Sequence, residues 1–284
     1  MRILALAPRH LGDGVMALPA LAGLARHGDL TIRAPSWGAA LYRDIPTVSP
    51  GPADVAVIFP PSVRAAWSVR AVPRRIGVGR VDRTIRGVPR WDVAIRRALL
   101  TDRVEEATHQ AETYARLAAA VGATAIGPPT WTARDDDPSV EVPGGHIGLN
   151  PACQVGIRAW GGWGELAAAL SLPVVYYAGP GEDPGGSPSR VGLSIPAFGR
   201  ALRRCAVFVS SDTGPAHFAR ACGVPTVVLH GPTAAARTGP TGAVPVEGPD
   251  PGCRPCYGKA CGIGRICMSI PVSEVLAAIA RASA

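Results

Sequence analysis

Short runs of apolar residues alternate with longer stretches of helical periodicity along most of the chain. The apolar runs are continuous and rich in Val, Ile and Leu, which is typical of strands buried on both faces of a parallel sheet. We expect strands at residues 3–7, 30–34, 55–59, 146–150, 174–178, 207–210 and 226–230. Helices are predicted at residues 15–26, 37–42, 105–121, 162–170, 197–204, 216–221 and 272–282. Strands that alternate with helices predict an α/β fold with parallel sheets.

The periodic pattern breaks at residues 127–145, which are rich in Pro, Gly and Asp. A strand–helix series starts afresh on each side of this break, near Ile3 and near Ile147. The sequence therefore predicts two α/β domains, at residues 1–138 and 139–270, and a C-terminal helix within residues 271–284.

The composition agrees with a globular protein. Hydrophobic residues make up 47% of the 284 residues, enough for a core and too many for general disorder. No apolar stretch of about 18 residues lacks charge, so we expect no membrane-spanning segment. Arg9 and Asp13 interrupt the apolar region that a secretory signal would need. We therefore expect a cytoplasmic location, where the seven cysteines would be reduced or metal-bound.

Positive charge is concentrated in one part of the chain. Residues 60–103 contain 11 Arg and 3 Asp, so their sum of +8 equals the net charge of the whole protein. Arginine grips phosphate bidentately, and this placement predicts an anionic ligand; a merely solvated surface is the alternative. Nucleic acid is not expected, because the segment lacks the interleaved aromatic residues of a stacking platform.

The turn after the first predicted strand has the features of a ligand site. Ligands of open α/β sheets bind beyond the carboxyl ends of the strands. Here the turn contains Gly12, Asp13 and Gly14, and the glycines allow close approach of the backbone. Asp13 is a candidate for chemistry in this turn, or a cap of the helix that follows.

A second turn, after residues 207–210, joins a strand to a helix through small and polar residues. The N–H groups of Thr213 and Gly214 at the helix start form a site the size of a phosphate. Asp212 and His217 are suited to orienting ligand hydroxyls or the turn itself. The alternative is an ordinary capped turn.

Two more predicted strands end in turns of this kind. Gly231 and Thr233 follow residues 226–230 and are placed to line the same site. Glu182 follows residues 174–178, where a carboxylate can bind a ribose diol, as in dinucleotide folds. Each turn taken alone also fits a purely structural role.

Four cysteines lie close together near the end of the chain. Cys253, Cys256, Cys261 and Cys267 have the close spacing of tetrahedral thiolate sites. The spacing predicts a closed, structural zinc or iron site, and four reduced thiols are the alternative.

Three segments together resemble glycosyltransferase family 9, the ADP-heptose heptosyltransferases. They are residues 1–24, residues 210–233 with the sequence SSDTGPAHFARACGVPTVVLHGPT, and residues 253–276. The resemblance implies the GT-B architecture, with two facing Rossmann-like domains that have parallel sheets. It also implies an acceptor on the first domain, a nucleotide sugar on the second, and inversion at the anomeric carbon without a catalytic metal.

The resemblance assigns roles to individual residues. Asp13 would be the general base, and Glu182 would bind the adenosine ribose of the donor. The family usually has Lys-x-Trp-Pro where this chain has Arg158-Ala-Trp-Gly, so Arg158 would hold the donor phosphates. The other donor-binding residues would be Asp212, Thr213, Gly214, His217, Gly231 and Thr233. The acceptor-binding residues would be Arg9, His10, Arg64, Arg83 and Arg86.

A related group, the autotransporter heptosyltransferases, holds iron in a four-cysteine site, so the resemblance makes iron as credible as zinc here. The first interpretation is an inverting glycosyltransferase that moves a heptose-type sugar from an ADP-activated donor to an anionic small-molecule or glycan acceptor. The second is a non-catalytic nucleotide-sugar-binding or metal-bearing assembly protein on the same fold. A binding protein would have no need of a carboxylate at Asp13.

Overall fold

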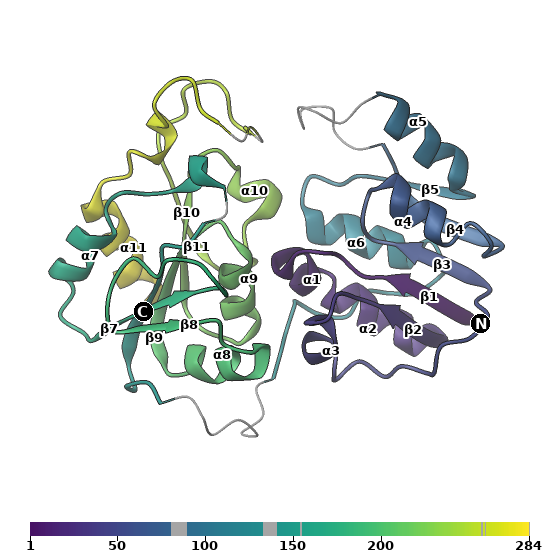
Figure 1. Ribbon diagram of the computed structural model, residues 1–284, viewed down its shortest axis with the longest axis horizontal. Helices are drawn as coiled ribbons and strands as arrows, with labels where there is room; N and C mark the ends of the chain where they lie inside the picture. Colours follow the sequence, from purple (N-terminus) through teal and green to yellow (C-terminus); the bar gives the residue numbers. More distant parts are fainter. Residues whose placement is uncertain (81–89, 133–140, 154, 257, 259, 284) are drawn as a thin grey trace. The chain divides into compact units, whose positions relative to one another are not determined.

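The computed structural model describes residues 1–80, 90–132, 141–153, 155–256, 258 and 260–283. The chain divides into two compact units, Met1–Thr130 and Trp131–Ala284. Each unit is an α/β domain with one parallel sheet (Figure 1). The domain boundary predicted between residues 138 and 139 lies outside the described residues.

The first unit contains a five-stranded sheet in the order β2-β1-β3-β4-β5, with all neighbours parallel. Its strands are β1 (Arg2–Leu6), β2 (Asp29–Arg33), β3 (Val55–Ile58), β4 (Arg74–Arg80) and β5 (Asp102–Glu105). Its helices are α1 (Leu11–Met16), α2 (Leu18–His27), α3 (Gly38–Leu41), α4 (Val63–Ser68), α5 (Arg90–Leu99) and α6 (Gln110–Ala119).

Alternate residues of the first sheet pack against different helices, because successive side chains point to opposite faces. Ile58 belongs to a cluster with Ala66 and Val69, at and just after α4. Phe59, the next residue along, instead packs against Tyr114 of α6, with ring centroids 5.2 Å apart. Both faces of β3 are therefore buried, which explains its continuous apolar sequence.

The second unit contains a six-stranded parallel sheet in the order β11-β10-β9-β6-β7-β8. Its strands are β6 (His146–Asn150), β7 (Val174–Ala178), β8 (Ser189–Val191), β9 (Cys205–Ser211), β10 (Thr226–His230) and β11 (Val244–Glu247). Its α-helices are α7 (Trp163–Ala169), α8 (Ile195–Leu202), α9 (Gly214–Ala221), α10 (Ala235–Thr238) and α11 (Val272–Ser283). Short 3₁₀ helices, η1 and η2, lie at Gly156–Arg158 and Ile266–Met268.

The second sheet is likewise covered on both faces. Val207 and Val209 of β9 share a core with Val275 and Ile279 of α11. Phe208, between them, points the other way and contacts Phe198 of α8, with ring centroids 6.2 Å apart. This arrangement leaves the carboxyl ends of the strands as the edge from which the predicted site residues extend.

All seven strands predicted from apolar runs are present, as β1, β2, β3, β6, β7, β9 and β10. The helix predicted at residues 15–26 is divided into α1 and α2 at Ala17, just ahead of Pro19 in the first turn of α2. The helix predicted from residue 105 begins only at Gln110, because Glu105 ends β5. The C-terminal helix is α11.

Part of the segment predicted to separate the domains, residues 127–145, packs within the second unit. Trp131 belongs to the second unit: its ring packs on Phe218, with centroids 4.9 Å apart, and its backbone N–H donates to the carbonyl of Ala221. Over the described residues, no helix combines the length and the apolar composition that crossing a bilayer requires.

Candidate functional site

Asp13 lies in the first turn of α1, directly beyond the carboxyl end of β1. The N-cap of this helix is His10, so Asp13 is not its capping residue. Burial raises the pKa of Tyr114 well above its usual value, and a hydrogen bond with Asp13 contributes to the rise. Burial, followed by the charge of Asp13, also raises the pKa of Tyr42. Two neutral phenols from α6 and from the end of α3 therefore flank the carboxylate of Asp13.

The glycine after Asp13 has a packing reason. A Cβ added to Gly14 would meet the hydroxyl of Tyr42 at 2.8 Å and the Trp37 ring at 3.0 Å. A larger residue would therefore push α3 away from α1, and Tyr42 would lose its position beside Asp13. Gly14 keeps the helix that carries the carboxylate close to α3.

The residues predicted to bind an acceptor are only partly described. Arg9 and His10 are exposed beyond β1, and Arg64 is exposed on α4. Arg83 and Arg86 lie outside the described residues.

Several arginines of residues 60–103 serve the fold. Arg74 forms an ion pair with Asp102 at 3.0 Å and donates to the carbonyl of Ala120. Arg75 donates to the carbonyls of Leu99 and Val72. Part of the positive charge of this segment therefore holds β4 to its neighbours.

In the second unit, the turn after β9 is held by its own polar side chains. Asn150, the last residue of β6, accepts through Oδ1 from the hydroxyls of Ser210 and Thr213, at 3.1 and 3.3 Å. The Thr213 hydroxyl also donates to the carbonyl of Ser211 at 3.2 Å. Thr213 is the N-cap of α9, yet its side chain makes these contacts and does not cap the helix. The start of α9 therefore keeps the features of an anion site.

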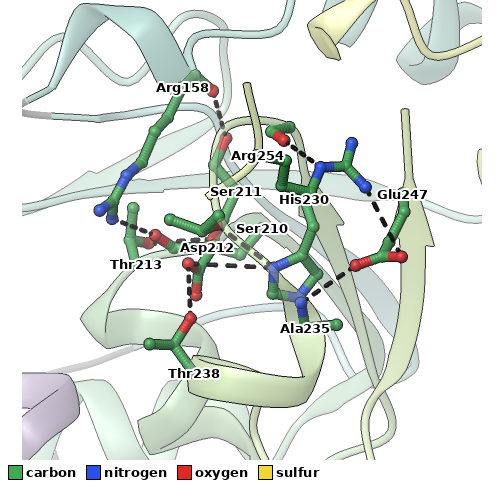
Figure 2. Close-up of polar contacts among 12 residues, drawn as sticks. Arg158, Ser210, Ser211, Asp212, Thr213, His230, Ala235, Thr238, Glu247 and Arg254 are labelled. Carbon is green, nitrogen blue, oxygen red and sulfur yellow. Dashed lines mark hydrogen bonds and ion pairs between the residues drawn. The ribbon is translucent and has the colours of Figure 1, made fainter. Parts of the chain in front are cut away.

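Arg158 reaches this turn from η1. Its Nη1 donates to the carbonyl of Asp212 at 2.8 Å, and the hydroxyl of Ser211 donates to the carbonyl of Arg158 at 3.4 Å (Figure 2). These contacts place a guanidinium next to the N-terminus of α9, where a diphosphate would gain from both.

The carboxylate of Asp212 is buried behind the turn. Its Oδ2 accepts from the hydroxyl of Thr238 at 3.2 Å and lies 3.9 Å from Nδ1 of His230 (Figure 2). Burial lowers the pKa of His230, and Asp212 only partly opposes this effect. The imidazole is therefore neutral at neutral pH, and the hydrogen bond from Thr238 of α10 is the contact that fixes the carboxylate of Asp212.

A second carboxylate ties the loops after β10 and β11 together. Glu247 accepts through Oε1 from the backbone N–H of Ala235 at 3.0 Å, and its Oε2 lies 3.6 Å from Nη1 of Arg254 (Figure 2). Arg254 also donates to the carbonyls of Gly231 and Gly248, at 2.8 and 2.6 Å. The loops that surround Asp212 are thus held by one ion pair and several backbone contacts.

The remaining predicted donor residues lie on the same edge or have structural contacts. Thr233 is buried, with its hydroxyl 3.5 Å from Nδ1 of His230, and His217 is buried on α9. Glu182 accepts through Oε2 from the N–H of Gly179 at 2.8 Å, which shapes its own turn beyond β7. A Cβ at Gly231 would overlap the sulfur of Met268, so this glycine allows η2 to pack against β10.

The predicted four-cysteine metal site is not formed in the structure. Among the described residues, no group of three or more His, Cys, Asp or Glu is placed to hold a metal ion. Cys267 lies in η2 and belongs to the hydrophobic core, whereas Cys253 and Cys261 are exposed. The N–H of Cys256 donates to the carbonyl of Pro232, so the backbone of Cys256 is held against the loop that follows β10. Cys267 is thus buried while two of the other thiols are exposed, although the charges of Cys253 and Cys261 still contribute, after burial, to raising the pKa of Cys267.

The cysteines are therefore expected to differ in reactivity. Hydrogen bonds from the backbone of Ile263 and of Arg265 lower the pKa of Cys261, whereas burial raises the pKa of Cys267. Since the thiolate is the nucleophile, iodoacetamide should alkylate Cys261 at lower pH than an ordinary thiol, and Cys267 much more slowly. Mass spectrometry after timed alkylation measures this order. A requirement for chelator before any of the four reacts would show instead that they hold a metal.

Some residues of this site were not predicted from the sequence. His230 and Arg254 lie in segments that the motifs covered, but a lone histidine or arginine carries no distinguishing signal there. Asn150 ends a predicted strand, and its polar side chain at that position is a signal from which it could have been found. Glu247 was missed together with its strand, β11.

Comparison with known proteins adds to this geometry. The family model described as glycosyltransferase family 9 (heptosyltransferase) matches residues 192–265, which include the turn after β9 and the loops after β10 and β11. A search of curated proteins finds no match.

Solved structures match over the whole length. The Escherichia coli ADP-heptose lipopolysaccharide heptosyltransferase II is 20% identical, with a TM-score of 0.73 and 100% of both chains covered. The E. coli heptosyltransferase WaaC, solved with ADP, is 15% identical, with a TM-score of 0.70 over 99% of this chain and 100% of that one. TibC of enterotoxigenic E. coli, an iron-containing dodecameric glycosyltransferase, is 13% identical, with a TM-score of 0.66 over 99% of this chain and 75% of that one.

These matches confirm the predicted fold class, a GT-B chain with two parallel-sheet α/β units. The family model agrees with the resemblance to glycosyltransferase family 9 over residues 192–265, and the solved heptosyltransferases share the fold of the whole chain.

Proposed function

We propose that this protein is an inverting glycosyltransferase that transfers a heptose-type sugar from an ADP-activated donor to an anionic acceptor. The observation that carries the proposal is the turn after β9, where Arg158 and the uncapped start of α9 meet above a buried Asp212. This arrangement supplies a cation and backbone N–H groups for a diphosphate. The turn after β9 and Asp212 lie within residues 192–265, which match the family 9 model, whereas Arg158 lies before them.

The donor is assigned to the second unit. Thr213 and Gly214 would contact the diphosphate through the backbone, and Arg158 through its guanidinium. Glu182, beyond β7, which β6 separates from β9 in the sheet, would bind the ribose. His217, Gly231 and Thr233 would complete the surroundings of the nucleotide sugar. Relatives that carry ADP-heptose or ADP in their descriptions support an ADP-sugar as donor.

The acceptor and the base are assigned to the first unit. Asp13 would take the proton from an acceptor hydroxyl as its oxygen attacks the anomeric carbon. The bond from that carbon to the diphosphate breaks, and ADP leaves with the electron pair, so the configuration inverts. The proposal includes no catalytic metal, and it keeps the predicted cytoplasmic location.

Incubation with ADP-heptose and phosphorylated glycans tests this function. Release of ADP and formation of a product with inverted anomeric configuration, read by NMR coupling constants, are expected. Retained configuration in the product would exclude the single displacement with Asp13 as base. ADP release at the same rate with and without every acceptor would mean hydrolysis rather than transfer.

Acceptor use should depend on salt. If Arg9, His10, Arg64, Arg83 and Arg86 attract an anionic acceptor, its Michaelis constant should rise with ionic strength, because exposed charges are screened beyond about 8–10 Å at 0.1–0.15 M salt. Arg64→Ala should raise this constant more than it lowers turnover, as a loss of ground-state binding does. Initial rates at several salt concentrations measure both effects. If a neutral acceptor is used efficiently, with rates that do not depend on salt, these charged residues are part of a solvated surface and do not bind the acceptor.

A further inference from the structure

Helix α5 presents an apolar stripe to solvent. Trp91, Ala94, Ile95 and Ala98 recur at the spacing of one helix face, and all four are exposed. Trp91 is 63% exposed and Ile95 is 43% exposed. A helix that packs on a sheet normally buries its apolar stripe against the sheet, so the exposure of this stripe to solvent needs an explanation.

The opposite face of α5 contains a charged residue that is buried. Arg96 is 2% exposed, and its Nη1 donates to the carbonyl of Val78 in β4. Burial lowers the pKa of Arg96, and Asp92, the one acid of α5, opposes this effect. This contact fixes the rotation of the helix about its axis. The apolar stripe is therefore held outward by a specific interaction with the sheet.

Helix α4 extends the same kind of surface. The two helices pack against each other at the edge of the first unit (Figure 1). Trp67 on α4 is 54% exposed, and the guanidinium of Arg70 lies 4.7 Å from the centroid of its ring. Trp67 and Trp91 are the exposed tryptophans of the chain; the other four of its six are buried or half-buried. The α4–α5 face, defined by Trp67, Trp91, Ile95 and Arg70, thus combines indole rings with a cation.

Charge identifies what this face can contact. Arg64, Arg70 and Arg97 are exposed on or beside these helices, and Asp92 is the one acidic residue in the sequences of α4 and α5. A second copy of the same face would bring together two strongly positive surfaces, which repel. A negatively charged surface with an apolar layer beneath it would accept both the arginines and the indoles.

We propose that the α4–α5 face docks on a bilayer that contains anionic lipids. Tryptophan favours the headgroup level of a membrane, and arginine beside it favours anionic headgroups. With ten residues, α5 is too short to span the hydrocarbon layer and would lie in the plane of the interface. The residues that define this face, Trp67, Arg70, Trp91 and Ile95, belong neither to the donor site nor to the Asp13 site, so the docking can be tested apart from glycosyl transfer.

Vesicle sedimentation tests the docking surface. The full-length protein is mixed with phosphatidylcholine vesicles that contain or lack phosphatidylglycerol. We expect binding only when phosphatidylglycerol is present, and weaker binding at high salt. Trp91→Ser with Ile95→Ser should lower the partition coefficient at least about tenfold. Arg97→Gln should lower it about fivefold. Leu172→Ser, at an exposed apolar residue of the second unit, is the matched control and should bind as the unaltered protein does.

Circular dichroism and thermal unfolding show whether each variant is folded, and Trp67→Ser gives an independent measurement from α4. The proposal is wrong if the unaltered protein stays in the supernatant with phosphatidylglycerol vesicles. It is also wrong if the Trp91→Ser, Ile95→Ser protein binds as well as the control. Sedimentation velocity that shows a dimer, converted to a monomer by these two changes, would assign the face to a second copy of the chain.

Discussion

Asp13→Asn is expected to lower turnover by about 10²–10⁴-fold and to leave the affinity for the nucleotide sugar unchanged. The amide is nearly the same size as the carboxylate but cannot accept the proton of an attacking hydroxyl. Asp13 lies in the first turn of α1, at the carboxyl end of β1, with a hydrogen bond to Tyr114. Steady-state rates and calorimetric donor binding on the same preparation measure the two quantities.

The control is Asp29→Asn. Asp29 is an exposed carboxylate at the start of β2, which pairs with β1, so it lies at the end of the sheet opposite to Asp13. It should change neither quantity. Unchanged turnover in Asp13→Asn would remove Asp13 from the mechanism. It would also favour the alternative in which the chain binds a nucleotide sugar without transferring it.

Arg158→Ala should weaken ADP binding by about 1.5–3 kcal/mol, the usual contribution of a hydrogen bond to a charged group. That energy corresponds to roughly 10- to 150-fold in the dissociation constant. Arg158 is fixed beside the start of α9 by its contact with the carbonyl of Asp212. The ADP affinity of Arg158→Lys should lie between that of the unaltered protein and that of Arg158→Ala, since lysine keeps the charge without the planar fork. Calorimetric titration with ADP measures each constant.

Arg203→Ala provides the matched comparison. Arg203 is exposed at the end of α8, just before the amino end of β9 and away from the predicted diphosphate site. Equal ADP affinity in the Arg158→Ala and Arg203→Ala proteins would show that Arg158 does not contact the donor. The altered Lys-x-Trp-Pro segment would then have no role in phosphate binding.

Most of the strands that could be predicted are buried on both faces; the edge strand β2 is the exception. The apolar runs of the buried strands are continuous and short, so both the pattern and the length of each run indicate a strand. β4 was missed because Arg74, Arg75 and Arg80 are not residues expected in a central strand. Its glycines have a packing reason: a Cβ at Gly77 would meet Leu100 at 2.9 Å. β11 was missed because Pro245 interrupts it, which an edge strand tolerates.

The site could be predicted where a strand ends in a turn of small and polar residues, as at Thr213. It could not where the partners come from separate parts of the chain. Nothing in the sequence indicates that His230 and Thr238 meet Asp212. The cysteine spacing alone could not indicate burial, and the structure places Cys267 in the core without forming a metal group among the described residues.

Calorimetric titration of the unaltered protein with ADP-heptose and with GDP-, UDP- and dTDP-sugars is the most direct test of the proposed function. We predict saturable binding of ADP-heptose at one site per chain, and much weaker binding of the other three. Binding of ADP-heptose should also be lost in large part on Arg158→Ala. No binding of ADP-heptose, or tighter binding of another nucleotide sugar, would contradict the proposal that the turn after β9 holds an ADP-activated donor.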